Sequence, residues 1–281
     1  MESLEAYFAD LTDKAEKANP KVEGDYFVDG LLYCGNCHTK KQHRLVLLGH
    51  EQTVSCLCKC VSERIEAERK AIEAQKRAEL IKELRREAFP CISMGNWTFD
   101  NDDRSNERVS DIMRRYTENF DKIRDQEING VILYGKTGTG KSYFSACVVN
   151  ALIDRGIPAL MTTFDHIRNR LQQSFEGRQD YIDQLAQYPF LVIDDLGAES
   201  ESEYMQEIIF SVIDARARSG KPLVITTNMT FDELKNPNTE RKKRVHSRVL
   251  GMCHPIEVVG SDRRKVRYKT ESQTMKDIIG L

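Results

Sequence analysis

The chain has 281 residues, with 42 basic against 44 acidic side chains, and this length accommodates one α/β domain with a substantial core plus one small extra module. Its formal net charge of −2 excludes a general attraction to nucleic acid or to an anionic membrane, so any contact with DNA has to be local. No apolar run approaches a membrane span, and the acidic residues near the start do not resemble a secretory signal, so we expect a cytoplasmic protein with no membrane partner.

Paired cysteines mark the amino-terminal part of the chain. Cys34 and Cys37 precede a hairpin-like stretch at residues 44–49, and Cys58 and Cys60 follow it. In a cytosolic protein such pairs are more often metal ligands than disulfides. Two thiolate pairs that meet across a hairpin supply the four ligands of a tetrahedral zinc site, which would stabilise a module too small to form its own core.

The ligand set has alternatives. Cys56, His38 and His43 lie in the same window, and each could replace one of the thiolates. A group of reduced surface cysteines is the competing interpretation, although five of the eight cysteines of the chain fall in this window. A catalytic zinc would need an open coordination position and a nearby general base, and nothing in the window suggests one. We therefore predict structural Zn²⁺.

A long helix without glycine or proline is predicted for residues 62–88, and Phe89–Pro90 ends it. Its charged residues surround a thin apolar stripe, which favours a solvated connector packed on one side. The stripe consists of Ile65, Ile72, Leu80 and Leu84.

The predicted domains are a zinc module at 1–61, a charged connector helix at 62–92 and a larger α/β domain at 93–281.

Residues 93–103 contain the only tryptophan of the chain, among turn-forming residues. Trp97 either lines a base-binding pocket or anchors the core, and the sequence does not separate these two hypotheses. A helix over residues 107–124 is predicted to follow.

Residues 131–142 combine an apolar strand, a glycine-rich turn and the start of a helix. The spacing Gly135-x4-Gly140-Lys141-Ser142 fits the phosphate-binding loop of nucleoside triphosphate-binding proteins. The glycines allow consecutive N–H groups to turn toward a phosphate, and the opening helix adds its dipole. Lys141 is expected on the β and γ phosphates, and the Ser142 hydroxyl on Mg²⁺. The predicted nucleotide-binding residues are Gly135, Lys136, Thr137, Gly138, Thr139, Gly140, Lys141, Ser142 and Tyr143.

Apolar segments at 159–162, 190–195, 223–227 and 255–259 predict further strands, and the helical segments between them indicate a parallel sheet with helices on both faces.

The strand at 190–195 ends in two carboxylates. We place it beside the P-loop strand, so that Asp194 holds Mg²⁺ and Asp195 polarises the attacking water. Asn228, at the tip of the next strand, would face the γ-phosphate. Two acids that merely cap a strand are the alternative.

Arg241–Arg244 is the densest positive charge in the chain. Such a run is usually only a solvated surface. Arg244 and Arg248 are four residues apart, so they share one side of any helix. Arginines displayed in this way could reach a γ-phosphate bound to a neighbouring subunit, so we expect self-association through the nucleotide sites.

Together these motifs resemble the AAA+ ATPases of the bacterial and phage replicative helicase loaders, the DnaC and DnaI type. The resemblance covers roughly residues 97–267, and the paired cysteines resemble the zinc-bearing amino-terminal domain of the loaders. Transposition helper ATPases of the IstB type share most of these features. The segments that carry the resemblance are Gly135–Ser142, Ile-Asp-Asp-Leu-Gly at Ile193–Gly197, Ile-Thr-Thr-Asn at Ile225–Asn228, and Arg244 with Arg248.

The resemblance implies a role for each matching residue. Lys141 and Ser142 would be the Walker A lysine and the magnesium ligand, and Asp194 the Walker B acid. Asp195 stands where most AAA+ proteins have glutamate, and its shorter side chain implies slow hydrolysis suited to a switch. The other implied roles are sensor 1 for Asn228, the arginine finger for Arg248 with Arg244 as its alternate, and the sensor-2 arginine for Arg264 or Arg263.

The resemblance also implies a function, which is the ATP-dependent loading of the hexameric replicative DNA helicase onto single-stranded DNA in replication initiation. The zinc module would contact the helicase. Arg168, Arg170 and Arg178 are candidate DNA contacts by charge and position.

Two other functions stay open. An IstB-type helper would act with a transposase on DNA, and a small-molecule or nucleotide kinase would use the same P-loop. The zinc module ahead of the P-loop domain favours the loader. The sequence leaves open a chromosomal or phage origin and the oligomeric state.

Overall fold

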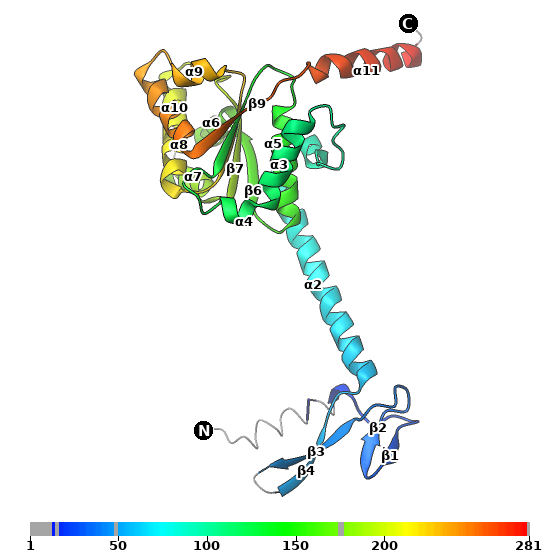
Figure 1. The fold of residues 1–281 in the computed structure, drawn as a ribbon. Helices are drawn as coiled ribbons and strands as arrows, with labels where there is room; N and C mark the ends of the chain where they lie inside the picture. The colour runs from blue at the N-terminus through cyan, green and yellow to red at the C-terminus, as the bar shows by residue number, and fades with distance from the viewer. Residues whose placement is uncertain (1–12, 15–16, 48–49, 174–176, 280–281) are drawn as a thin grey trace. The chain divides into compact units, whose positions relative to one another are not determined.

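The computed structural model describes residues 13–14, 17–47, 50–173 and 177–279. The chain divides into two compact units, Met1–Ala78 and Glu79–Leu281, and Figure 1 names their helices and strands. Over the described ranges, no helix is both long enough and apolar enough to cross a membrane.

Two small antiparallel hairpins form the first unit (Figure 1). β1 (Tyr26–Val28) pairs with β2 (Leu31–Tyr33), and β3 (Gln42–Leu47) pairs with β4 (His50–Ser55), where the sequence predicted a hairpin. Asp29 and Gly30 both have positive φ, 51° and 76°, as a tight two-residue hairpin turn requires. The buried apolar residues are few, namely Leu31, Leu32, Cys34 and Cys58 among those described.

α2 (Lys59–Glu87) is the predicted long charged helix. Ion pairs between residues four apart line its surface, for example Lys70 with Glu66 at 2.7 Å. The expected packing of its apolar stripe is largely wrong, because Ile65, Ile72 and Leu80 are exposed. Only the last turns pack, through Ile81 and Leu84, against the core of the second unit to which they belong.

The second unit is built on a five-stranded parallel sheet in the order β6-β7-β8-β5-β9. Its strands agree with the expected segments except the last one, since the strand expected at 255–259 is found at Cys253–Glu257. The prediction that the strand with two acids lies beside the P-loop strand is wrong, because β8 lies between β7 and β5. The bounds are Gly130–Tyr134 for β5, Ala159–Thr163 for β6, Phe190–Leu196 for β7, Leu223–Thr227 for β8 and Cys253–Glu257 for β9.

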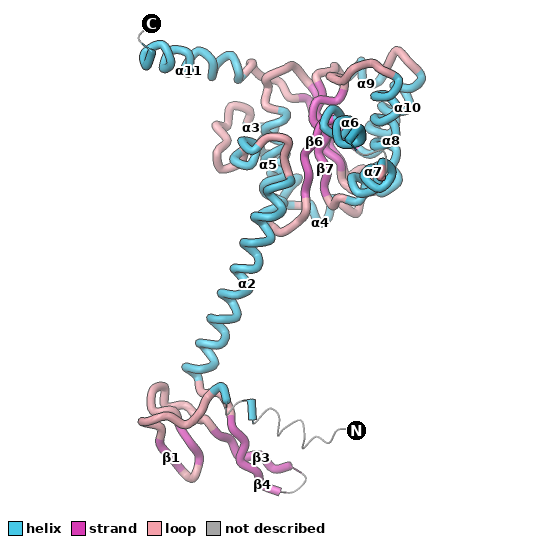
Figure 2. Tube along the Cα trace, turned by 180° about the vertical axis from the view of Figure 1, so that it is seen from behind, coloured by secondary structure: helices cyan, strands magenta, loops and turns pink. Residues whose placement is uncertain are grey.

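Helices cover both faces of this sheet (Figure 2). α3 (Glu107–Glu118), α4 (Phe120–Ile123) and α5 (Lys141–Asp154) contribute to one buried apolar cluster. The other cluster takes its helical residues from five helices on the opposite face. These are α6 (Phe164–Gln173), α7 (Arg178–Gln187), α8 (Glu203–Ser219), α9 (Phe231–Lys235) and α10 (Glu240–Met252).

Three local differences separate the structure from the sequence prediction. The helix expected over 107–124 is divided at Asn119, which ends α3 with φ −97° and ψ 14°. The polar residues after Arg263 form a helix, α11 (Arg263–Ile279), which was not predicted. Residues 235–243 were expected to be polar and irregular, but α10 begins at Glu240, where the Thr239 side chain accepts the N–H of Lys242 as an N-cap.

Candidate functional site

The P-loop joins β5 to α5 and leaves no room for side chains at two of its glycines. At Gly135, with φ 140°, a Cβ atom would lie 2.5 Å from the carbonyl oxygen of Val258. At Gly138, with φ 81°, a Cβ atom would lie 1.9 Å from the Asp262 carboxylate. Glycine is therefore required at both positions by backbone angle and by space.

Lys141 begins α5, and its ammonium is held inside the loop. Its Nζ donates to the carbonyl oxygens of Gly135 and Lys136 and to Oδ1 of Asn228, each at 2.8 Å. Burial lowers the pKa of this lysine, while the nearby charges of Asp195 and Asp194 oppose that shift. The ammonium thus lies where β5, α5 and β8 meet, and a phosphate there would replace neutral carbonyl partners with a charged one.

The two acids that end β7 occupy different environments. Asp194 is buried, and its Oδ1 accepts the Thr226 hydroxyl at 2.6 Å. Burial raises the pKa of Asp194, and hydrogen bonds from Thr226 and Ser142 lower it. Two oxygen groups, the Ser142 hydroxyl and the Asp194 carboxylate, therefore lie together at the start of α5, and oxygen is the ligand that Mg²⁺ prefers. Asp195 points into the adjoining cavity.

A cavity of about 820 Å³ opens over the P-loop. Its volume suits a small-molecule ligand. Trp97 lines the cavity, as one of the two hypotheses proposed, and its ring lies 5.8 Å from the ring of Tyr143. The predicted residues that line it are Thr137, Gly138, Gly140, Lys141, Ser142, Tyr143, Asp195, Asn228, Arg263 and Arg264. A neighbouring cavity of about 360 Å³ is lined by Gly135, Lys136 and Thr139.

The two candidate sensor-2 arginines differ in their contacts. Arg263 donates through Nε to the Ser105 hydroxyl at 2.9 Å, pairs with Asp103 and lies over the Tyr143 ring. Arg264 lines the cavity, and its charge lowers the pKa of Lys141. Both arginines line the cavity, but Arg263 is already bound to the segment before α3, whereas the charge of Arg264 acts on Lys141.

The two candidate finger arginines lie on α10, and neither lines the cavity over the P-loop. Arg248 pairs with Asp214 of α8 at 2.7 Å and lies over the Phe210 ring. Arg244 is exposed and lines a separate cavity between α8 and α10. Neither side chain serves the nucleotide site of its own chain.

The candidate DNA contacts do not form one surface cluster. Arg168 pairs with Asp165 at 3.2 Å, and Arg178 lies over the Tyr204 ring and donates to its hydroxyl. Arg170 lines a polar groove of about 640 Å³ at β6, the edge strand of the sheet. Their contact with DNA stays a prediction.

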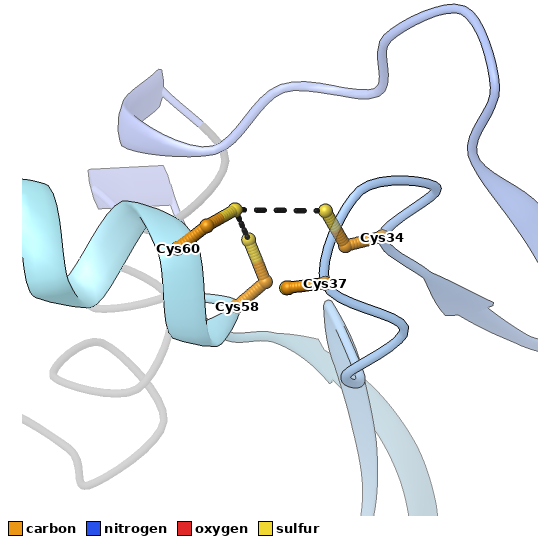
Figure 3. Close-up of side chains that lie close together, drawn as sticks. All are labelled: Cys34, Cys37, Cys58 and Cys60. Carbon is orange, nitrogen blue, oxygen red and sulfur yellow. Dashed lines mark hydrogen bonds between the residues drawn. The ribbon is translucent and has the colours of Figure 1, made fainter.

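The paired cysteines come together in the first unit (Figure 3). The Sγ atoms of Cys34, Cys37, Cys58 and Cys60 all lie within 4.8 Å of one another, with Cys58 and Cys60 3.4 Å apart. Zinc–sulfur bonds of about 2.3 Å in a tetrahedron place the sulfur atoms about 3.8 Å apart, so the cluster has the size and donor set of a zinc site. Within the cluster a hydrogen bond with Thr39 lowers the pKa of Cys37, whereas hydrogen bonds with Cys58, Cys37 and Cys34 raise the pKa of Cys60.

The alternative ligands lie outside this cluster. Cys56 hydrogen-bonds to the Lys40 carbonyl, and His38 contacts the Tyr26 hydroxyl at 3.1 Å through Nδ1. His43 lies in β3, opposite Val54. The structure therefore groups the four cysteines of the preferred prediction.

A buried ion pair supports the turn that carries Cys34 and Cys37. Lys41 Nζ lies 2.7 Å from Asp25 Oδ2, and both side chains are almost fully buried. The other Asp25 oxygen accepts the N–H of Gly35 at 3.0 Å. These contacts lower the pKa of Asp25 to about 2. Sequence analysis missed this pair, because the two residues have no motif and meet only through the fold.

Other residues of the nucleotide site were also missed. Asp103 and Ser105 line the cavity and bind Arg263, and Thr226 holds the acids. Thr226 did leave a signal, since a hydroxyl in an otherwise apolar buried strand needs a partner. Asp103 and Ser105 left none, because their partner lies far along the chain.

The chain is similar to known ATP-binding proteins. The model of the family described as IstB-like ATP binding protein matches residues 45–273. The replicative helicase loader DnaC of Escherichia coli strain K12 is 32% identical over 125 residues, which are 43% of this chain and 49% of DnaC. The replicative helicase loader DnaI of Bacillus subtilis strain 168 is 26% identical over 170 residues, 56% of this chain and 53% of DnaI. The chain thus spans about half the length of these curated relatives.

Solved structures show the same fold. A crystal structure of DnaI superposes with a TM-score of 0.52 and 22% identity, covering 63% of this chain and 95% of that one. A crystal structure of the DnaC helicase loader also gives a TM-score of 0.52 at 22% identity, covering 60% of this chain and all of that one, 100%. The predicted fold, a P-loop AAA+ domain with helices on both faces of a parallel sheet, is confirmed.

Proposed function

This chain belongs to the family of IstB-like ATP-binding proteins, and from that premise we propose that it is an ATP-driven loader of the hexameric replicative DNA helicase onto single-stranded DNA. The observation that carries the proposal is the match of its ATP-binding domain to relatives named replicative helicase loaders, DnaC and DnaI. The four-cysteine cluster ahead of that domain supports the loader over a transposition helper.

ATP hydrolysis follows from the groups that converge on the cavity. Lys141 would bind the β and γ phosphates, and Asn228, already hydrogen-bonded to it, would orient the γ-phosphate. Asp195 lines the cavity and would accept the proton of the attacking water. Ser142 and Asp194 would hold Mg²⁺, which neutralises charge on the phosphates. Arg264 would contact the γ-phosphate from the other wall.

Self-association would complete the site. Because Arg244 and Arg248 lie away from their own cavity, an arginine finger from α10 would act on the nucleotide of a neighbouring subunit. Arg248 matched the finger position best in the sequence, but it already pairs with Asp214. We therefore propose its alternate, Arg244, as the finger. ATP binding would then align the subunits, and slow hydrolysis would release them.

The cysteine cluster would hold Zn²⁺ as a structural metal, because four thiolates leave no open position for chemistry. We propose residues 1–61 as the helicase-contacting module, 62–92 as the connector and 93–281 as the ATPase domain. The groove at Arg170 would take single-stranded DNA. Loss of ATP-dependent single-strand binding in Arg170→Ala, with ATP affinity unchanged, is the expected result.

The test is size-exclusion chromatography with light scattering. The full chain is mixed with the replicative helicase of its host, with and without ATP, beside Lys141→Ala and Arg244→Ala. We expect a stoichiometric complex with the hexamer. ATP should change the amount or the size of this complex for the wild-type protein but not for Lys141→Ala. Arg244→Ala should bind ATP but lose ATP-dependent self-association. Absence of any complex with the helicase would contradict the loader function. Binding to a transposase on DNA would then support the transposition-helper function instead.

A further inference from the structure

Strands β7 and β8 change register beside the nucleotide cavity. Ile193 pairs with Ile225, but Leu196 pairs with Thr227, so Asp194 and Asp195 together face the single residue Thr226. A bulge of this kind bends its strand and turns a side chain in a new direction. At this bulge Asp195 has a left-handed backbone with φ 60°, a conformation that is unfavourable for a residue with a Cβ.

The Thr226 hydroxyl holds both acids in this arrangement. Thr226 is completely buried, its Oγ1 donates to Asp194 Oδ1 at 2.6 Å, and the same atom accepts the N–H of Asp195 at 2.9 Å. A hydroxyl has one proton to donate, so its bond to the carboxylate leaves a lone pair for the amide. A bulged residue otherwise lacks a ladder partner for its N–H, and a buried N–H without a partner is costly.

The bulge separates the positions of the two acids. Asp194 is buried beside Ser142, whereas Asp195 lines the cavity with Lys141 and Asn228. In a regular strand, successive side chains point to opposite faces of the sheet. Because the bulge replaces that alternation, the direction of the Asp195 carboxylate depends on what holds the bulge in place.

We propose that Thr226 is a positioning residue that aims Asp195 at the attacking water and thereby sets the rate of ATP hydrolysis. This inference rests on the proposed ATPase function. Thr226 does not touch the nucleotide, since it lies beneath the acids and does not line the cavity. Its loss should therefore slow the chemical step without weakening ATP binding.

The experiment compares four full-length proteins in steady-state ATP hydrolysis, with helicase and single-stranded DNA present. Thr226→Val keeps nearly the same shape but makes neither hydrogen bond, and Thr226→Ser keeps the hydroxyl. Thr162→Val is the matched control, because Thr162 is a buried threonine of β6, on the other side of β7, whose hydroxyl donates to the Thr163 carbonyl. Hydrogen exchange of the Asp195 amide is measured in parallel.

In Thr226→Val, kcat is expected to fall about tenfold to a hundredfold while the KM for ATP changes by less than about threefold, because the P-loop is untouched. The Asp195 amide should exchange faster. Thr226→Ser should recover most of the rate, and Thr162→Val should match the wild type.

Three results would overturn the proposal. The first is wild-type kcat in Thr226→Val, and the second is a serine variant as slow as the valine variant. The third is a joint loss of kcat and ATP binding, which would assign Thr226 a purely structural role. A wild-type protein without turnover under any of these conditions would refute the proposed hydrolysis, and this inference with it, before any variant is compared.

Discussion

The carboxylate of Asp195 reaches the nucleotide cavity because its backbone leaves the regular strand. Aspartate tolerates the left-handed conformation better than most residues, because its short polar side chain can hydrogen-bond locally. Its φ of 60° and the bulge at β7 place it among the cavity residues, while its neighbour Asp194 stays buried. A local conformation thus gives two adjacent acids two different environments.

Asp195→Asn tests the chemistry of this residue. The amide has nearly the same shape but cannot accept a proton from water, so we expect kcat for ATP hydrolysis to fall about a hundredfold. ATP affinity should stay within about threefold of wild type, since Lys141 and the P-loop are unchanged. The measurement is single-turnover hydrolysis beside equilibrium binding of a fluorescent ATP analogue. Hydrolysis at the wild-type rate would show that another group activates the water.

At the scale of elements, β8 connects the two halves of the nucleotide site. It lies between β7, which carries the acids, and β5, which leads into the P-loop. Asn228 at its end accepts a hydrogen bond from Lys141, and Thr226 within it bonds to Asp194. One strand therefore contacts both the phosphate-binding lysine and the buried acid.

The packing of α10 against α9 contains a buried histidine that makes stability depend on pH. His246 is buried with Nδ1 3.1 Å from the Leu234 carbonyl oxygen, and burial lowers its pKa below the ordinary value of 6.5. Well above pH 6.5 the ring is neutral in both folded and unfolded chains. As the pH falls below 6.5 the unfolded chain takes up the proton first, so the free energy of unfolding should decrease until the folded pKa is passed.

The prediction is checked by chemical denaturation at pH values between about 7.5 and about 5.5, roughly one unit either side of the ordinary histidine pKa. His246→Asn keeps a donor near the Leu234 carbonyl but does not titrate, so its free energy of unfolding should depend less on pH than that of the wild type. His254→Asn, at an exposed residue of β9, is the control and should follow the wild type. Equal pH dependence in all three proteins would contradict this assignment.

At the scale of the whole molecule, the cysteine cluster and the nucleotide cavity belong to different compact units. The cysteine unit has few buried apolar residues, so a bound metal would supply much of its folding free energy. The nucleotide cavity is lined by residues of the second unit, which has its own sheet and two apolar clusters.

Metal removal should therefore affect the two units differently. We expect a strong chelator, or Cys37→Ser with Cys60→Ser, to abolish helicase binding while ATP affinity stays within about twofold, because the P-loop domain has its own core. Cys91→Ser, at an exposed cysteine outside the cluster, is the matched control. Metal content, protease sensitivity and ATP binding are measured on the same preparations. An equal loss of ATP binding and metal would show that the units depend on each other.

The features that depend on local spacing could be predicted from the sequence. The P-loop from Gly135 to Ser142, the acids after an apolar strand and the two cysteine pairs are each contained in a few consecutive residues, so their chemistry is legible without a fold. Alternating apolar strands and helices also predicted a parallel sheet with both faces covered.

The features that depend on which distant segments meet could not be predicted from the sequence and are visible only in the folded chain. Strand order follows from the packing of the whole sheet. The prediction that the strand with two acids lies beside the P-loop strand was therefore wrong, because β8 lies between β7 and β5. The bulge at Asp195 lies where β7 changes register against β8, and that register depends on how the two strands pair. The exclusion of Cys56 from the cysteine cluster likewise depends on distances that spacing along the chain does not encode, because they are set by contacts between residues far apart in sequence.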